Sequence, residues 1–82
     1  MKAIVIVTLK PTVLDPQGIT IQRSIQSIGL SEVVDVRQGK TFDVVLADGV
    51  PTDKGKEVVQ KLAKEVLTNP VIEEFRIEWE QK

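Results

Sequence analysis

Glutamate pairs near the end of this sequence have the residue type that acid–base catalysis uses. Glu73 and Glu74 are adjacent, so in an extended strand their side chains point to opposite faces and cannot act on one substrate. Glu78 and Glu80 share a face, but that face is a charged, solvated one. General acid–base catalysis needs groups that converge in a cleft with different pKa values. We therefore assign no catalytic residue to this chain.

The 82-residue sequence contains neither cysteine nor histidine. The absence of cysteine excludes a disulfide framework, a thiolate metal site and a cysteine nucleophile. The absence of histidine removes the commonest general base and metal ligand. We expect no metal site on this chain, and both absences fit a cytoplasmic protein.

An Asp-Pro pair predicts the start of a helix whose free N–H groups, at Gln17 and Gly18, are of the kind that binds phosphate. Lys10 and Arg23 would lie nearby, but the glycines form no nucleotide-binding fingerprint. Asp15 would occupy this helix end as a cap, and its negative charge opposes an anionic ligand. The pattern favours a structural cap.

A tight hairpin turn is predicted around Gly39, and Arg37 and Lys40 flank it with Gln38. Such a turn has two interpretations, and the residue types favour the first. It is either a solubilising surface turn or a rigid docking surface that projects its side chains toward a partner.

The bulk composition predicts one domain over residues 1–82, with a core small enough that oligomerisation would stabilise it. The net charge is −1 with scattered Lys and Arg, so we expect no nucleic-acid partner. An RNA-binding sheet would also need exposed aromatic residues, whereas Phe42 and Phe75 are predicted to face the core. No apolar run is long enough to span a membrane, and no membrane association is expected.

Hydrophobic periodicity predicts the first two elements. Residues 2–9 are dense in β-branched residues and read as a central strand. Asp15 and Pro16 are expected at the N-cap and first position of a helix that runs to about Ile28. Gly29 is expected to follow it in the left-handed conformation.

The remaining elements are two strands, a helix and a last strand. Residues 32–38 and 41–48 are predicted strands joined by a Gly39-Lys40 hairpin. A helix capped by Thr52 should reach Leu67. Its buried stripe would comprise Val59, Leu62, Ala63 and Val66. Residues 71–80 alternate as a strand, with Phe75, Ile77 and Trp79 pointing inward.

The order βαββαβ predicts an α+β, ferredoxin-like split-βαβ fold: a four-stranded antiparallel sheet with both helices on one face. The uncovered face would then expose an apolar centre inside a charged rim, which is typical of an interface. We therefore predict a homodimer or higher oligomer that uses the sheet surface or edges. The interface candidates are Val5, Val7, Val45 and Ala47.

Five short motifs then occur in a specific order. They are TLKPTVLDPQG (residues 8–18), Gln22, Gly29, VRQGK (residues 36–40) and NPVIEEF (residues 69–75). Over essentially the whole chain, this combination resembles the PurS family, the small subunit of phosphoribosylformylglycinamidine (FGAM) synthase. An independent ligand-binding or regulatory module of the ACT type, which shares the topology, is the alternative.

The resemblance implies a non-catalytic role in de novo purine biosynthesis. The complex converts formylglycinamide ribonucleotide, glutamine and ATP to FGAM, glutamate, ADP and phosphate. The resemblance further implies that the chain bridges a glutaminase subunit and a large synthetase subunit, and that the chain assists ammonia transfer. The synthetase subunit would bind ATP and Mg²⁺. No cofactor is expected on this chain. The residues that it implies as partner contacts are Lys10, Asp15, Gln17, Gly18, Arg37, Gly39, Lys40, Asn69 and Glu73.

Overall fold

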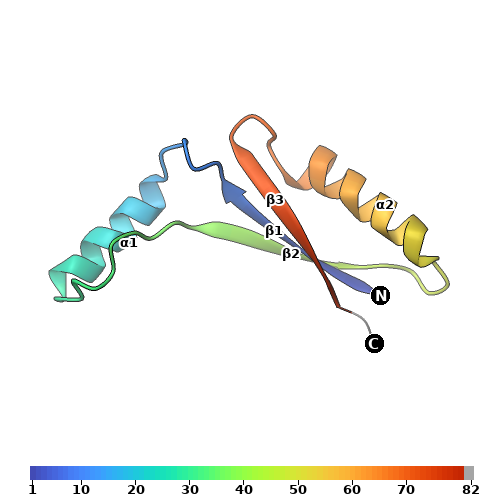
Figure 1. The fold of residues 1–82 in the computed structure, drawn as a ribbon, viewed down its shortest axis with the longest axis horizontal. Coiled ribbons are helices and arrows are strands. Elements are labelled where there is room, and N and C mark those ends of the chain that lie inside the picture. The colour runs from blue at the N-terminus through green and yellow to red at the C-terminus, as the bar shows by residue number, and fades with distance from the viewer. Residues whose placement is uncertain (81–82) are drawn as a thin grey trace.

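The structure, a computed structural model, describes residues 1–80 of this α+β protein (Figure 1). Within these residues, three strands and two helices alternate along the chain, and a π-helical turn extends the second helix. The elements are β1 (Lys2–Leu9), α1 (Pro16–Ser27), β2 (Gly39–Val45), α2 (Thr52–Leu62), η1 (Ala63–Leu67) and β3 (Glu73–Glu80).

The three strands form an antiparallel sheet in the order β2-β1-β3, with the β-branched strand β1 at its centre. Val5 of β1 lies opposite Phe42 of β2 and Ile77 of β3. Because side chains alternate along a strand, this register places the apolar rows of all three strands on one face. The predicted inward orientation of Phe75, Ile77 and Trp79 is confirmed.

Helix α2 and η1 pack on that face and complete the core. Val59 and Ala63 are fully buried together with Ala3, Val5 and Val7 of β1. Half-buried side chains from the strands and from Leu67 surround this cluster. The second helical segment ends at Leu67, as predicted, but its N-cap is Pro51 rather than Thr52.

The π turn changes which residues the second helix buries. Periodicity predicts Val66 in the buried stripe, yet its side chain is 71% exposed, and Leu67 packs against the core instead. A π turn holds more residues than an α turn and rotates those beyond it around the axis. The predicted burial of Val66 is therefore wrong.

Helix α1 begins and ends as predicted but does not cover the sheet. Asp15 is its N-cap, Pro16 is its first residue, and Gly29 follows with φ +86°. Figure 1 places α1 beyond one end of the sheet, with α2 toward the other. Gly18 is its one buried residue, and Ile21 and Ile28 are exposed. The prediction that both helices cover one face is wrong.

Residues 32–38 run straight into β2, so the predicted Gly39-Lys40 hairpin is absent. Gly39 and Lys40 are instead the first residues of β2 and pair with Thr8 and Val7. Residues 32–38 form no strand, because no neighbouring strand within the described chain offers them a ladder of hydrogen bonds. The described sheet therefore has three strands, not the predicted four. We call residues 16–38 the arm.

Two of the four predicted interface residues, Val5 and Val7 of β1, face the core and not the uncovered face of the sheet. Val5 and Val7 lie in the core beneath α2, whereas Val45 and Ala47 are exposed. On the uncovered face Val45 lies opposite Lys2, and the exposed row of β1 continues with half-buried Ile4 and Ile6. The correction removes Val5 and Val7 from the uncovered face.

The molecule is long and thin, 51 × 30 × 14 Å, with a radius of gyration of 16.4 Å. A compact chain of 82 residues would have a radius of gyration of about 12 Å. Its surface of 6098 Å² exceeds the roughly 4,900 Å² of a compact monomer of this mass. The elongated shape therefore leaves roughly 1,200 Å² of additional surface exposed.

Two matched valines test the register of the second helix. We expect Val59→Ala to lower the free energy of unfolding by about 2 kcal/mol, because it empties a fully buried site. Val66→Ala should change it by less than about 0.5 kcal/mol, because that side chain is exposed. Denaturant unfolding measures both. Equal losses would contradict the rotated register of η1.

Candidate interaction site at the arm junction

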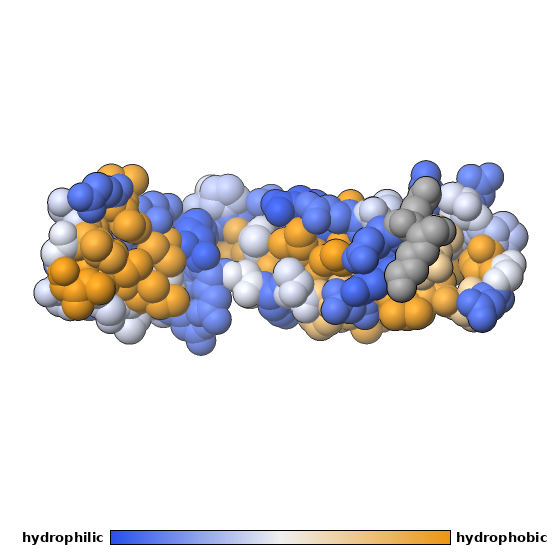
Figure 2. Space-filling model, turned by 90° about the horizontal axis from the view of Figure 1, so that it is seen from below, coloured by the Kyte–Doolittle hydropathy of each residue, from blue (hydrophilic) through white to orange (hydrophobic). Residues whose placement is uncertain are grey.

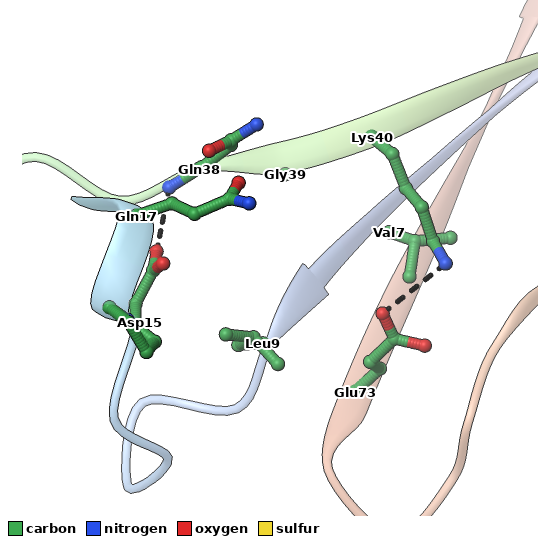
Figure 3. Close-up of a pocket in the computed structure, with 9 residues that line it drawn as sticks. Val7, Leu9, Asp15, Gln17, Gln38, Gly39, Lys40 and Glu73 are labelled. Atoms are coloured by element: carbon green, nitrogen blue, oxygen red, sulfur yellow. Dashed lines mark hydrogen bonds and ion pairs between the residues drawn. The ribbon is translucent and has the colours of Figure 1, made fainter. Parts of the chain in front are cut away.

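One carboxylate joins the two chain segments that connect the arm to the sheet. Oδ1 of Asp15 accepts a hydrogen bond from the Gly18 amide of α1 at 3.0 Å. Oδ2 accepts another from the Gln38 amide, immediately before β2, at 2.8 Å. Asp15 is 6% exposed, so both bonds are shielded from water. The Asp-Pro cap therefore fixes the helix start against the entry to β2 (Figure 3).

Arg37 makes the reciprocal connection. Its guanidinium Nη2 donates to the carbonyl oxygens of Lys10 at 3.2 Å and Val13 at 2.9 Å. One turn into α1, the Gln22 side chain donates to the carbonyl of Val34 at 2.8 Å. Together with Asp15, these bonds hold the segment before β2 against both the 10–15 turn and α1. Hydrogen bonds thus join residues 34–38 to α1 and to the turn that precedes it.

Gly18 allows this close approach. A Cβ at this position would clash with the carbonyl oxygen of Val36, so a side chain is not tolerated here. Glycine in a first helical turn carries a modest cost in helix propensity. Glycine is nevertheless required here, because the backbone of Val36 passes directly over this turn of the helix.

The environment of Asp15 lowers the pKa of its carboxyl below the ordinary value of 3.8. The hydrogen bond from the Gly18 amide is the largest cause, followed by that from the Gln38 amide, and the Arg37 charge adds to them. Desolvation acts in the opposite direction and is outweighed. Asp15 is therefore ionised at neutral pH, and the ionised form is the one that bridges the junction.

A cavity of about 410 Å³ lies between the start of the arm and the sheet (Figure 3). Val7, Leu9 and Pro16 supply apolar surface, and polar side chains surround them. The lining residues are Val7, Leu9, Asp15, Pro16, Gln17, Gln38, Gly39, Lys40 and Glu73. The cavity is large enough for one or two side chains of another protein.

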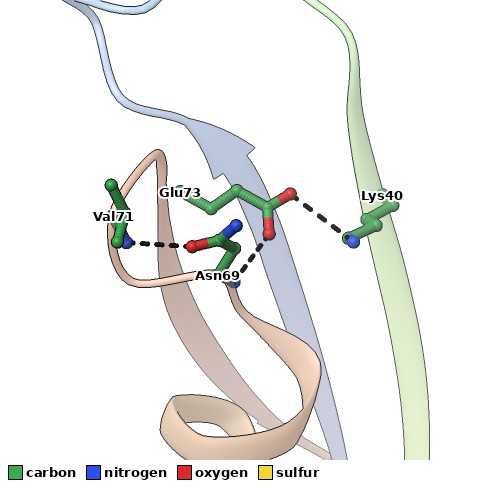
Figure 4. A network of polar contacts seen from close by, with 4 residues as sticks. All are labelled: Lys40, Asn69, Val71 and Glu73. Carbon is green, nitrogen blue, oxygen red and sulfur yellow. Dashed lines mark hydrogen bonds and ion pairs between the residues drawn. The ribbon is translucent and has the colours of Figure 1, made fainter.

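A second polar network closes the opposite wall of this cavity (Figure 4). Glu73 Oε2 lies 3.5 Å from Lys40 Nζ, and Glu73 Oε1 accepts the Asn69 amide at 2.8 Å. Asn69 Oδ1 in turn accepts the Val71 amide at 3.1 Å. The Glu73 side chain is 16% exposed and that of Lys40 is 52% exposed, so only the carboxylate of this pair is shielded from water. The network fixes the turn before β3 to the first residues of β2.

The structure brings the nine predicted contact residues to one junction. Five line the cavity: Asp15, Gln17, Gly39, Lys40 and Glu73. Gly18 and Arg37 hold its arm side through Asp15 and the 10–15 turn, and Asn69 holds Glu73. The Lys10 carbonyl accepts a hydrogen bond from the Arg37 guanidinium, and the Lys10 amide donates to the Ile72 carbonyl at 2.9 Å. Three places that are separate in the sequence are one place in the fold.

Sequence reasoning missed the residues that act through their backbone or their apolar side chains. Gln38 contributes an amide, and Val36 contributes a carbonyl that only glycine tolerates. Val7 and Leu9 contribute apolar surface of the cavity. A polar pattern gives no signal for such residues. The glycine in the first turn of α1 was the one available sign of a close backbone contact.

The junction has the chemistry of a recognition surface. Its charges are already paired or hydrogen-bonded within the chain, with Asp15 beside Arg37 and Glu73 beside Lys40. Among residues 1–80, no group of three or more acidic side chains is arranged to hold a metal ion. In the same part of the chain, no helix is both long enough and apolar enough to cross a membrane.

The Asp15 bridge predicts a pH-dependent stability. Because its pKa is lowered on folding, ionised Asp15 stabilises the fold above its unfolded pKa of about 3.9, and this contribution is lost as pH falls through the folded value. Asp15→Asn keeps the shape but loses one acceptor. We expect it to be less stable than the wild type at pH 7, with the difference shrinking below about pH 4.

Thermal unfolding of both proteins from pH 7 to pH 3 measures this difference. Val66→Ala, which changes no ionisable group, serves as the control. A gap between wild type and Asp15→Asn that stays constant down to pH 3 would contradict the bridging role of the carboxylate.

Comparison with known proteins gives consistent results. The family model for PurS, FGAM synthase, matches residues 2–81. The PurS subunit of FGAM synthase from Methanocaldococcus jannaschii is 40% identical over 80 residues, which cover 98% of this chain and 95% of the relative. The Bacillus subtilis PurS subunit is 38% identical over 81 residues, covering 98% and 93%.

Solved structures agree. The crystal structure of M. jannaschii PurS superposes with a TM-score of 0.85 at 38% identity, covering 99% of this chain and 96% of that one. A chain of the PurLQS structure from Thermotoga maritima gives a TM-score of 0.79 at 33% identity, covering 94% of each. The resemblance noted in the sequence is confirmed, and the chain belongs to the PurS family of FGAM synthase subunits.

Proposed function

We propose that this chain is the non-catalytic bridging subunit of an FGAM synthase in de novo purine biosynthesis. The observation that carries the proposal is its match to PurS subunits over nearly the full length of both chains. This observation favours a complex subunit over an independent ACT-type regulatory module. The reaction would use glutamine and ATP. The glutaminase subunit would release ammonia, and the synthetase subunit would hold ATP and Mg²⁺ in the cytoplasm.

A bridging role accounts for the chemistry of the chain. A subunit that aligns two enzymes raises their effective concentration and fixes their relative geometry, and it needs no reacting groups of its own. Ammonia released into water at neutral pH would mostly protonate and lose its nucleophilicity. A sealed contact between glutaminase and synthetase avoids that loss. Our proposal is that this chain holds that contact in register.

The junction is our candidate for the surface that touches the other subunits. Its cavity is partly open and apolar at its base, and its walls are fixed by Asp15, Arg37 and Glu73. A surface that is already rigid loses little conformational entropy when a partner binds. Gln17 and Lys40 extend their side chains along the cavity and are candidates for direct contacts (Figure 3). Arg37 would act mainly by holding the 10–15 turn.

We further propose that a second copy of the chain covers the arm. Figure 2 shows hydrophobic side chains gathered at the end of the molecule that α1 occupies. The exposed apolar side chains of the arm are Ile21, Ile28, Leu30 and Val34. The additional surface of roughly 1,200 Å² is more than the about 800 Å² that each partner buries in a standard interface. An arm of this size supports a stable homodimer.

The backbone of the arm supports the same proposal. Within the described chain, the amides of residues 34–37 donate no hydrogen bond, and these residues continue the line of β2. If two copies meet about a two-fold axis near Gly39, residues 32–38 of each can pair with β2 of the other. Each sheet then gains its fourth strand from the partner subunit. Such an exchange of identical elements is a low-cost route to a dimer.

Reconstitution tests the bridging role. The synthetase and glutaminase subunits of the same organism are assayed with and without this chain, with either glutamine or ammonia as the nitrogen source. We expect omission to abolish glutamine-dependent turnover and to spare most of the ammonia-dependent turnover, because only ammonia transfer requires the alignment. Equal loss of both rates would mean that the chain shapes the synthetase site itself.

Two exposed valines distinguish the arm from the sheet face as the dimer interface. Val34 of the arm is 83% exposed and Val45 of the sheet face is 75% exposed. We expect Val34→Lys to weaken the dimer at least about tenfold, because a buried unpaired charge opposes association. Val45→Lys should leave it intact. Sedimentation equilibrium gives the masses, relative to 9.1 kDa for one chain. The opposite pattern would place the interface on the sheet face.

A further inference from the structure

The turn that joins β2 to α2 contains Asp48-Gly49, the one place in this sequence where glycine follows aspartate. Both residues are exposed. Gly49 has a φ of +84°, a backbone conformation that favours glycine. Within residues 1–80, one hydrogen bond closes the turn, and its 3.4 Å from the Val50 amide to the Ala47 carbonyl exceeds the common length of about 3.0 Å. The turn is therefore open to solvent and weakly held.

The backbone amide of Gly49 can react with the side chain that precedes it. Among the described residues, this amide donates no hydrogen bond. A bond from its nitrogen to Cγ of Asp48 closes a five-membered ring. Glycine has no Cβ to obstruct this approach, and it lets the peptide group rotate toward the carboxyl. Local opening of an exposed turn costs little free energy, so the folded chain can reach the reactive geometry.

We propose that Asp48-Gly49 is a site of spontaneous aspartate isomerisation. The Gly49 nitrogen bonds to Cγ of Asp48 and loses its proton, and the hydroxyl of the protonated carboxyl leaves with that proton as water. A cyclic imide results. Water then adds to one of the two imide carbonyls and breaks its C–N bond. Hydrolysis at Cγ restores aspartate, whereas hydrolysis at the backbone carbonyl carbon leaves the main chain running through the side chain. The water that is lost is regained, so the isomerised chain has an unchanged mass.

The other four aspartates each lack at least one of these conditions. Asp15 is buried and precedes a proline, whose nitrogen carries no proton. Asp43 lies within β2, and Asp53 lies in the first turn of α2, so regular structure restricts both. Asp35 is the closest match. It is exposed, and within the described chain the amide that follows it donates no hydrogen bond, but that amide belongs to the β-branched Val36, whose side chain obstructs the approach.

The modification would disturb the core, because this turn places α2 on the sheet. The β-linked residue adds one carbon to the main chain directly before Val50. The side chains of Val50, Leu46 and Met1 surround the buried Gly55 in the first turns of α2. An altered turn therefore shifts the start of α2 relative to β2. We expect the isomerised chain to unfold at a lower denaturant concentration. This inference does not depend on the bridging function or on the arm.

Enzymatic methylation measures the product after the purified full chain has been kept in warm neutral buffer for several weeks. The probe is protein L-isoaspartyl methyltransferase with S-adenosylmethionine, which methylates the carboxylate that β-linkage frees. Trypsin releases residues 41–54, which contain Asp48, and residues 24–37, which contain Asp35. We expect the first peptide to carry at least about ten times more methyl groups, because only there does glycine follow the aspartate. Electron-based fragmentation should place the linkage at Asp48. Equal labelling, no labelling, or a linkage at another aspartate would overturn the proposal.

Two variants at an exposed position supply a second measurement. Asp48→Glu keeps the charge and the glycine but needs a six-membered ring, which closes far more slowly, so we expect it to abolish labelling of residues 41–54. Asp48→Asn keeps the ring size and has a better leaving group, so it should isomerise faster than the wild type and release ammonia. Circular dichroism checks that both variants fold. Labelling that persists in Asp48→Glu, or an Asp48→Asn chain that releases no ammonia, would show that the imide does not form at this turn.

Discussion

The two hydrogen bonds that Asp15 accepts determine the shape of this protein. Two chain segments connect the arm to the sheet, and one carboxylate holds an amide from α1 and an amide from the segment that enters β2. Arg37 returns the connection from the second segment to the turn before the first. Without these bonds the arm would be joined by two independent flexible linkers. With them it is a rigid extension that keeps its apolar side chains away from its own core.

That shape leaves both apolar side chains and backbone amides of the protomer without partners, and the two lie on the same segment. A compact chain of 82 residues buries a smaller fraction of its surface than a larger domain does, and this one exposes more than a compact chain would. The arm exposes four large apolar side chains, and its extended part carries amides without partners in the described chain. Hydrophobic surface and unpaired backbone occur on the same segment. One kind of contact, a strand and helix packed on another chain, satisfies both.

Local signals in the sequence predicted most elements but not the direction in which the arm leaves the sheet. The strand at residues 2–9, the Asp15 cap and the left-handed Gly29 depend on neighbouring residues, and the structure has them as predicted. Residues 32–40 did not form the predicted hairpin. Glycine at 39 allows a tight turn and equally allows close strand pairing. The choice depends on contacts between residues far apart in sequence, such as Asp15 with Gln38.

The candidate site was predicted as a set of residues and not as a geometry. The sequence motifs supplied Asp15, Gly18, Arg37 and Glu73 without indicating that they meet. Their meeting depends on backbone groups, such as the carbonyl of Val36 above Gly18, which carry no residue-type signal. The same limit applied to Val66, since a π turn shifts helical phase without any change in the apolar pattern.

The motifs therefore have an explanation within one chain that also bears on docking. LDPQG and VRQGK form the two halves of one contact: Asp15 requires the Gln38 amide, Gly18 requires the Val36 carbonyl, and Arg37 requires the 10–15 turn. A change in either motif would disturb the other before it disturbed any partner. A subunit without reacting groups contributes through the precision of its surfaces, and this contact places the walls of the junction cavity at fixed positions. Loss of partner binding after a change in Asp15 or Arg37 would thus report on the shape of the surface, whereas Gln17 and Lys40, whose side chains extend along the cavity, would report on direct contact with a partner.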